Sequence, residues 1–314
     1  MKLIKVSLVV PLLNEEESIK NLCESIYRQS FQPDEVVLVD GGSTDKTVEI
    51  VEKICLERAG IKLVKTDGAT PGKGRNIGTL NARNEWIAYT DAGIKLSDDW
   101  LAELVQIIDE DPESAIVYGN YSPVINNFFE KCAMFAFVPP QSENGLRGKS
   151  IASSLIKKDV WKAVGGFPDL RAAEDLIFME TAEKQGFRVG FAPKAMIYWQ
   201  LRPNLSSTFQ KFVVYSKYNV WAERQWDWHY GIAKQYLLMV PFLLLAVFHS
   251  WWWLTIMPAW LFARTAKRIL LHRYEYRFTP LLNPLILFGV AFLIIVIDLA
   301  TFIGWIQAIL RKNG

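Results

Sequence analysis

The stretch that most limits the fold of this chain runs from Trp86 to Gly93. Trp86 to Thr90 is an apolar run rich in aromatic and β-branched side chains, which predicts a buried strand. The run ends on Asp91, which is followed by Ala92 and Gly93. In open α/β sheets, ligands bind beyond the carboxyl ends of the strands. Asp91 is therefore a candidate site residue, although an acid at this position can also simply cap a turn.

Strands and helices alternate around this stretch. Apolar runs at 6–10, 35–39, 61–65 and 115–118 predict further strands, separated by segments with helical spacing of apolar residues. Asp40 ends the second strand as Asp91 ends the fourth, and Asn14 with Glu17 predicts a helical capping box. This order predicts an α/β fold with three layers and a mostly parallel sheet. The glycine pattern of dinucleotide-binding folds and the Walker P-loop are both missing from the sequence.

Charge is distributed unevenly along the chain. The net charge of +2 predicts no general attraction to nucleic acid, and we expect no nucleic-acid partner. The apolar segments 235–263 and 279–310 contain one charged residue, Asp298. Each segment exceeds the ~20 residues that cross a bilayer as a helix. Because the N-terminus does not resemble a cleavable signal peptide, we expect an inner-membrane protein whose N-terminal domain faces the cytosol.

Three regions are expected from this pattern. Residues 1–205 form the α/β domain, residues 206–233 an amphipathic interfacial helix and linker, and residues 234–314 a membrane region. Residues 120–150 lose the α/β rhythm, and they form either a packed insertion or a membrane-facing flap.

The membrane topology has two solutions. Two spans would place the basic segment between them on the outer side, against the positive-inside tendency. If 235–263 dips into the membrane and returns, that segment stays cytosolic. The basic residues concerned are Arg264, Lys267, Arg268, Arg273 and Arg277.

Five motifs then occur in the order found in glycosyltransferase family 2. They are Val9 to Glu16, Val39 to Asp45, Thr90 to Gly93, Gly165 to Pro168, and the pair Glu174-Asp175. The chain resembles the membrane-associated members of this family, which build exopolysaccharides or glycosylate lipid carriers. The resemblance covers about residues 5–205. It implies the GT-A fold, a nucleotide-diphospho-sugar donor, and inversion at the anomeric carbon.

The resemblance also assigns roles to residues. Asp175 matches the general base, with Glu174 beside it, and Asp40 matches the acid that contacts the nucleotide base. Inverting transfer needs such a carboxylate to take the proton of the acceptor hydroxyl. The leaving diphosphate needs positive charge, which Lys73 and Arg75 can supply unless they only begin a solvated helix. The predicted donor-binding residues are Pro11, Asn14, Glu15, Asp40, Lys73, Arg75, Asp91, Ala92 and Gly93.

The motif of the fourth strand departs from the family pattern. Asp91 matches the first acid of the Asp-x-Asp motif, whereas Gly93 replaces the second acid, which is usually the metal ligand. We therefore expect Mg²⁺ or Mn²⁺ to bind through Asp91 with water and phosphate oxygens, or with another acid.

The sequence thus predicts a membrane-bound inverting glycosyltransferase that acts on a lipid-linked or growing glycan, in contact with membrane lipids. Gln200 to Pro203 lacks the Gln-x-x-Arg-Trp motif of processive relatives, which favours the addition of one sugar per encounter. One alternative is a polyprenyl-phosphate glycosyltransferase, whose phosphate acceptor needs little base catalysis. Another is a non-catalytic nucleotide-sugar-binding subunit of a polysaccharide assembly.

Overall fold

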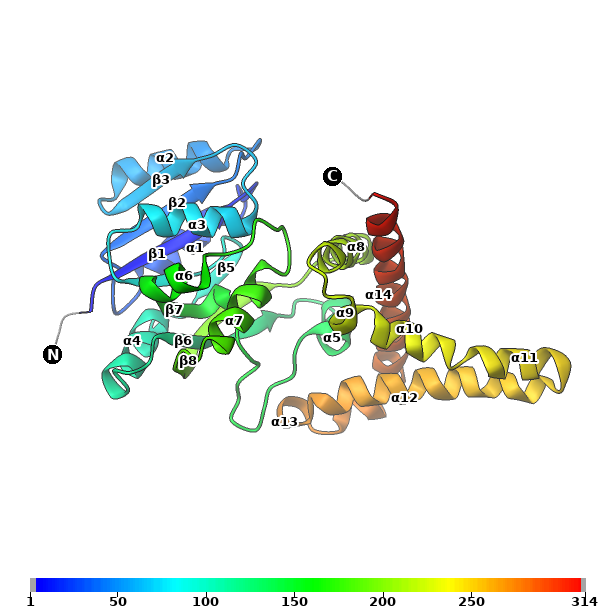
Figure 1. Cartoon of the computed structure of the whole chain (residues 1–314). Coiled ribbons are helices and arrows are strands. Elements are labelled where there is room, and N and C mark those ends of the chain that lie inside the picture. The colour runs from blue at the N-terminus through cyan, green and yellow to red at the C-terminus, as the bar shows by residue number, and fades with distance from the viewer. Residues whose placement is uncertain (1–3, 312–314) are drawn as a thin grey trace. The chain divides into compact units, whose positions relative to one another are not determined.

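The computed structural model describes residues 4–311, which form two compact units (Figure 1). The α/β unit consists of the chain up to Val124 together with Leu146–Gln200. The helical unit consists of Ile125–Gly145 and the chain from Leu201 onward. Ile125–Gly145 therefore belongs with the C-terminal helices, although it lies between two strands in the sequence.

A mixed sheet runs through the α/β unit, and its described strands follow the order β3-β2-β1-β4-β7-β6-β8-β5. The first four strands of the sequence pair in parallel, as their alternation with helices predicts. β7 and β5 pair antiparallel with their neighbours, while β6 and β8 are parallel. The strands are β1 (Val6–Leu12), β2 (Glu35–Asp40), β3 (Ile61–Lys65), β4 (Trp86–Tyr89), β5 (Ile94–Leu96), β6 (Ile116–Val124), β7 (Ser154–Lys157) and β8 (Val189–Gln200).

Helices cover both faces of this sheet, and an apolar cluster fills each interface. One face carries α1 (Ile19–Tyr27), α2 (Thr47–Glu57) and α4 (Trp100–Glu110). The other carries α3 (Pro71–Asn81), α6 (Lys158–Val164) and α7 (Glu174–Lys184), and a short 3₁₀ helix, η1 (Ile151–Ser153), precedes β7. The three-layer α/β fold predicted from the sequence is confirmed.

One local prediction in this unit is wrong. Asn14 has a left-handed backbone with φ of 55°, and α1 begins only at Ile19, so the capping box with Glu17 does not form. The Asn14 side chain instead accepts a hydrogen bond from the Thr44 N–H at 2.8 Å. This bond ties the loop after β1 to the loop after β2. The segment from Pro71 is the start of α3, and the Thr70 side chain caps it by accepting the Lys73 N–H.

The helical unit contains the apolar segments. Tyr230–Phe248 and Pro284–Leu310 are each long and apolar enough to cross a membrane. The apolar segment 235–263 is not one helix, because a helix ends at Phe248 and the next helical segment begins at Trp251. The described helices are α5 (Phe128–Phe137), α8 (Leu205–Trp221), α9 (Gln225–Trp228), α10 (Tyr230–Leu237), α11 (Val240–Phe248), η2 (Trp251–Thr255), α12 (Ile256–Leu271), α13 (Arg273–Tyr276), η3 (Thr279–Leu282) and α14 (Pro284–Leu310).

One face of α14 packs closely against other helices of this unit. A Cβ atom at Gly304 would lie 2.4 Å from the Val213 carbonyl oxygen of α8. A Cβ atom at Gly289 would lie 2.5 Å from the Cys132 sulfur of α5. Small residues permit such close approach between apolar helices. Of the two possibilities for residues 120–150, the packed insertion therefore describes α5.

Candidate active site

Acidic residues from two segments meet one arginine on α3. Arg75 donates from Nη2 to Asp91 Oδ1 at 2.7 Å and from Nη1 to Glu174 Oε1 at 2.7 Å. Asp91 follows the end of β4, and Glu174 is the first residue of α7. The fold thus joins three residues that the sequence singled out separately. Asp175 directly follows one of them, Glu174, in the chain.

The arginine at the centre of this cluster is buried. The Arg75 side chain is 5% exposed and that of Glu174 is 7% exposed, whereas that of Asp91 is 42% exposed. Burial disfavours the guanidinium charge, but the carboxylates of Asp91 and Glu174 raise the pKa of Arg75 above its ordinary value. The guanidinium also lies 5.6 Å from the centre of the Phe167 ring. Arg75 is therefore a permanent cation whose hydrogen bonds hold two carboxylates in place.

The two adjacent acids at the start of α7 have different environments. Glu174 is buried against Arg75, while Asp175 is half-buried and its Oδ1 accepts the Leu176 N–H at 2.8 Å. Burial raises the pKa of Asp175 above its ordinary value, and the Arg75 charge opposes this rise. Burial likewise raises the pKa of Glu174, with Arg75 again acting in the opposite direction. A carboxylate with a raised pKa is a stronger proton acceptor once it is ionised.

The backbone before these acids is constrained. Ala173 has a left-handed conformation with φ of 71°, which is unusual for a residue with a Cβ atom. Both Ala172 and Ala173 are buried. Such conformations persist where the surroundings fix them, and they cluster at functional sites. The bend at Ala173 lies directly before Glu174 and Asp175, the first two residues of α7.

The turn that leads to α7 is fixed by α3. Asn76 Nδ2 donates to the Phe167 carbonyl at 2.7 Å, and Asn76 Oδ1 accepts the Phe167 N–H at 2.8 Å and Trp161 Nε1 at 2.9 Å. A Cβ atom at Gly72 would lie 2.1 Å from the Pro168 carbonyl oxygen. The motif Gly165 to Pro168 is therefore a turn that α3 holds in position, and the same helix carries Arg75.

The predicted nucleotide-binding residues form a second group, at the ends of β1 and β2. The Asp40 carboxylate is buried and accepts the backbone N–H groups of Gly42 at 3.0 Å and Ser43 at 3.1 Å. The Asn14 N–H donates to Ser43 Oγ at 2.8 Å. Asp40 and Asn14 therefore shape the two loops beyond these strands.

The remaining predicted donor residues lie nearby or on α3. Pro11 lies in β1 and pairs with Val39, and a Cβ atom at Gly74 would lie 3.1 Å from Pro11 Cβ. Lys73 is exposed in the first turn of α3, and Ala92 is buried. Lys73 therefore differs from Arg75, because its amine is available to solvent while the guanidinium is held by carboxylates.

Gly93 is exposed, and Glu15 lies beside it. A Cβ atom at Gly93 would lie 3.8 Å from Glu15 Oε2, which accepts a hydrogen bond from Ser18 Oγ. Within the described residues, 4–311, three His, Cys, Asp or Glu side chains do not converge at any point as a ready metal site. Oxygen ligands suit Mg²⁺ and Mn²⁺, so Asp91 and Glu15 are the carboxylates at this edge that fit such an ion.

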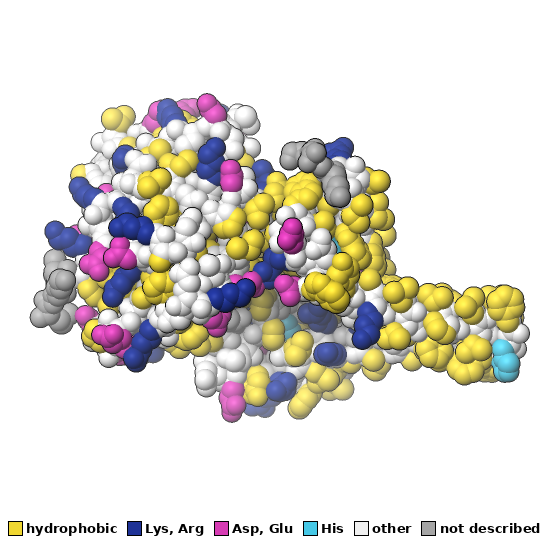
Figure 2. All heavy atoms as spheres, viewed as in Figure 1, with side chains coloured by type: hydrophobic (Ala, Val, Ile, Leu, Met, Phe, Trp, Pro, Cys, Tyr) yellow, Lys and Arg dark blue, Asp and Glu magenta, His cyan; other side chains and the backbone are white. Residues whose placement is uncertain are grey.

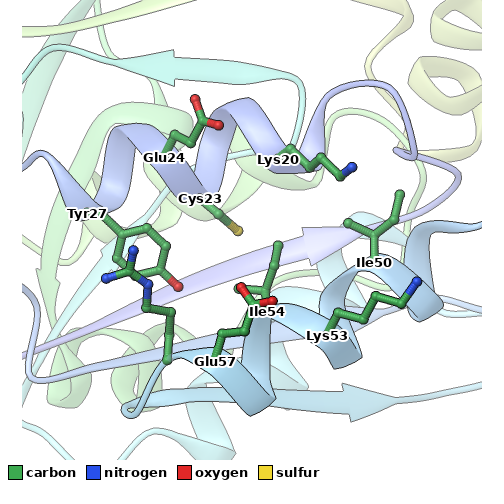
Figure 3. A pocket seen from close by; sticks show the side chains of 9 residues that line it. Lys20, Cys23, Glu24, Tyr27, Ile50, Lys53, Ile54 and Glu57 are labelled. Carbon is green, nitrogen blue, oxygen red and sulfur yellow. The ribbon is translucent and has the colours of Figure 1, made fainter.

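A surface groove lies elsewhere in the α/β unit, between α1 and α2 (Figure 3). Its volume is ≈ 380 Å³, and Cys23, Tyr27 and Ile54 are among the residues that line it. Burial raises the pKa of the Cys23 thiol to about 11, so this sulfur is a poor nucleophile at neutral pH. The groove contains none of the predicted site residues, and we assign it no part in the chemistry.

Sequence reasoning missed Asn76 and Gly72 as residues that position the site. A signal was present, because Gly72 and Gly74 flank Lys73 within one helical turn. Glycine is unfavourable inside a helix, and its presence there indicates a close approach of another chain segment. The sequence around Arg75 and around Glu174 does not indicate that these two residues pair.

Comparison with known proteins finds similarity to glycosyltransferases. Residues 7–157 match the family model described as glycosyl transferase family 2. Poly(ribitol-phosphate) beta-N-acetylglucosaminyltransferase TarS of Staphylococcus aureus (strain Mu50 / ATCC 700699) is 34% identical over 112 residues, which are 34% of this chain and 19% of TarS. Succinoglycan biosynthesis protein ExoA of Rhizobium meliloti (strain 1021) is 26% identical over 230 residues, which are 67% of each chain.

The fold is shared with solved structures. Mannosyltransferase PcManGT from Pyrobaculum calidifontis, in complex with GDP-Man and Mn²⁺, superposes with a TM-score of 0.68. The match covers 98% of this chain and 88% of PcManGT at 17% sequence identity. The mixed sheet and its helical layers therefore form the GT-A fold. Residues 7–157, just under half of the chain, form a glycosyl transferase family 2 domain.

Proposed function

We propose that this protein is a membrane-bound inverting glycosyltransferase, which moves a sugar from a nucleotide-diphospho-sugar to a lipid-linked or growing glycan. The observation that supports this proposal is the cluster in which Arg75 holds Asp91 and Glu174, directly beside Asp175. Family 2 membership favours the reaction class, and the matched relatives include proteins named for cell-surface polymers.

Asp175 is the general base in this proposal. Its carboxylate takes the proton of the acceptor hydroxyl while that oxygen bonds to the anomeric carbon. The bond from the anomeric carbon to the diphosphate oxygen breaks with its electron pair, and the nucleoside diphosphate leaves from the opposite face. Inversion follows from this direct displacement. Glu174, fixed by Arg75, orients the acceptor or the base.

The donor binds at the loops beyond β1, β2 and β4. Asp40 and Asn14 shape the surface for the nucleotide base, and Asp91, Ala92 and Gly93 lie toward the diphosphate. Lys73 is exposed and supplies positive charge to the leaving group, whereas Arg75 acts mainly by positioning the acids. Asp91, with Glu15 beside Gly93, would hold Mg²⁺ or Mn²⁺. Such an ion stabilises negative charge on a departing diphosphate.

The helical unit attaches the enzyme to the membrane in this proposal, with the α/β unit in the cytosol. Two apolar helices of sufficient length support the attachment.

Thermal unfolding of the detergent-purified protein, with a panel of nucleoside diphosphates and with or without Mn²⁺ or Mg²⁺, tests the donor site. A ligand at a hundred times its dissociation constant stabilises the fold by ~2.7 kcal/mol, which raises the melting temperature measurably. We expect a shift with one nucleotide that is lost in Asp40→Ala and Asp91→Ala but kept in Asp159→Ala, an exposed acid on α6. If no nucleotide shifts the transition, the donor-site proposal fails.

A further inference from the structure

The uncharged segment 235–263 does not continue in one direction. α10 and α11 lead outward, the chain turns at His249-Ser250, and η2 and α12 lead back (Figure 1). Trp253 Nε1 donates to His249 Nδ1 at 3.4 Å across this turn. The segment is therefore two arms that run in different directions, and the first arm, Tyr230–Phe248, is long and apolar enough to reach across a membrane.

Side-chain contacts establish that the arms are antiparallel. Near the tip, the rings of Phe242 and Trp253 lie 6.0 Å apart. Farther back, the rings of Tyr236 and Trp260 lie 5.2 Å apart, and the Arg264 guanidinium lies 5.9 Å from the Tyr236 ring. Earlier residues of the first arm therefore contact later residues of the second arm. The arms thus form a helical hairpin, which we call hairpin 230–271.

The surface of this hairpin is apolar along its length (Figure 2). Val247 is 72% exposed, Phe248 83%, Trp251 78% and Trp252 80%. Soluble proteins rarely expose a continuous apolar patch of more than a few hundred Å². A surface that is apolar on all sides is suited to lipid rather than to one protein partner, which would cover one face.

Basic residues gather at the opposite end of the hairpin from its tip. Lys267, Arg268, Arg273 and Arg277 are exposed there, and Lys234 is exposed on the outward arm. Arg264 is neutralised by Asp298 of α14, with Nη1 at 2.6 Å from Oδ2. Exposed Lys and Arg next to an apolar segment attract anionic lipid headgroups on the cytosolic leaflet.

We propose that hairpin 230–271 enters the bilayer from the cytosolic side and returns to it, so that the basic segment 264–277 binds anionic headgroups on the side of the α/β unit. This inference rests on the proposed membrane attachment and specifies how it is made. It removes the conflict that arises when 235–263 is a single span, because that arrangement places the same basic residues outside. The partner at this surface is an anionic lipid bilayer.

Single-cysteine labelling tests the inference in the full-length protein. Cys23, Cys55 and Cys132 are first replaced by Ala. Leu56→Cys then marks the α/β unit, since Leu56 is 89% exposed, and Tyr274→Cys marks the basic segment, since Tyr274 is 49% exposed. A membrane-impermeant maleimide is added to sealed vesicles of both orientations. We expect both sites to be labelled in inside-out vesicles and neither in right-side-out vesicles. Labelling of the two sites from opposite faces overturns the hairpin.

Burial of the outward arm in lipid gives an independent test. In the cysteine-free protein, Leu244→Cys lies in the middle of α11, and Leu56→Cys on α2 is its matched control. Because α14 is also long and apolar enough to hold the protein in a membrane, the readout is reaction with a water-soluble maleimide rather than membrane retention. We expect Leu244→Cys to resist the maleimide in vesicles of either orientation and to react after denaturation in SDS, whereas Leu56→Cys reacts in inside-out vesicles. Labelling of Leu244→Cys in intact vesicles overturns insertion of the arm. The nucleotide-dependent thermal shift is measured separately, so failure of the hairpin is distinguishable from failure of the donor site.

Discussion

The α/β unit and the helical unit place polar and apolar groups in opposite ways. In the α/β unit, large apolar side chains such as Leu104 are fully buried, and a buried cation is held by carboxylates around Arg75. In the helical unit, large apolar side chains such as Leu244 are exposed, while a few polar contacts join the helices inside. Ser216 Oγ, for example, donates to the Thr301 carbonyl at 2.7 Å. The first unit thus buries its large apolar side chains, whereas the second exposes them, as the proposed contact with lipid requires.

The largest effect is expected from loss of the proposed base, Asp175. Its replacement should lower the rate of sugar transfer without changing membrane attachment. Asp175→Asn removes proton acceptance from a hydroxyl acceptor, and we expect transfer to fall by about 10²–10⁴-fold. Membrane retention and nucleotide binding should stay unchanged, because both depend on other residues. Steady-state transfer assays check this, with Asp159→Asn as the control. A phosphate acceptor would leave the rate nearly unaffected, which would favour the polyprenyl-phosphate alternative.

Removal of the buried cation should destabilise the α/β unit. Arg75→Ala leaves Glu174 buried without its partner, which costs about 3–5 kcal/mol. Lys162→Ala is the matched control, because the side chains of Lys162 and its partner Asp159 are both exposed, at 61% and 79%, and such a pair contributes at most about 1 kcal/mol. Chemical denaturation of both variants measures the difference.

The pH dependence of the Arg75→Ala defect has a defined sign. Burial raises the pKa of Glu174, and without Arg75 nothing comparable opposes that rise. A folded-state pKa above the unfolded value favours the native state at low pH and penalises it as the pH rises through the folded value. The loss of stability should therefore shrink as the pH is lowered toward 4.5, the ordinary value for glutamate. A pH-independent loss would contradict this account.

A matched pair of leucines sharpens the contrast between the units. Leu104→Ala opens a cavity in the α/β core and should lower the free energy of unfolding by about 2–5 kcal/mol. Leu244→Ala removes exposed apolar surface and should change it by less than about 0.5 kcal/mol in detergent. Thermal unfolding of both variants makes the comparison. Equal losses would show that the α11 surface is buried in the native protein.

The smallest expected effect is a shift in a pH profile. Because burial raises the pKa of Asp175, the acidic limb of the transfer rate should lie above the ordinary aspartate value of 3.8. Protonation of the base below that limb abolishes its function. Arg75 lowers the same pKa, so Arg75→Lys, which keeps the charge, should retain the limb near its wild-type position. A rate that is independent of pH from 4 to 7 would argue against Asp175 as the base.

The sequence was informative where local pattern determines structure. Asp40 and Asp91 lie where their strands end because a buried apolar run can only stop at a polar turn. The alternation of strands with helices predicted the parallel pairing of β1 to β4, because a helix between two strands returns the chain to the same end of the sheet. Asp175 at the start of α7 followed from the motif that it shares with family 2.

Long-range and conformational features were not predictable in this way. The bond from Arg75 to Glu174 joins residues 99 apart, and no spacing rule indicates it. Asn14 suits a helix cap in sequence, yet its bond to Thr44 holds it in a left-handed turn. The reversal after Phe248 was one of the two topologies that the sequence left open, because the apolar composition continues on both sides of His249-Ser250.

The charges near Arg75 have a consequence for how the donor arrives. One guanidinium lies in the field of three carboxylates, Asp91, Glu174 and Asp175. In the proposed function, a nucleoside diphosphate adds further negative charge at this edge, which a bound cation would offset together with Lys73. Thermodynamic reciprocity then applies, because whatever affinity the cation lends to the nucleotide, the nucleotide lends equally to the cation. We therefore expect the nucleotide and the cation each to bind much more weakly when the other is absent.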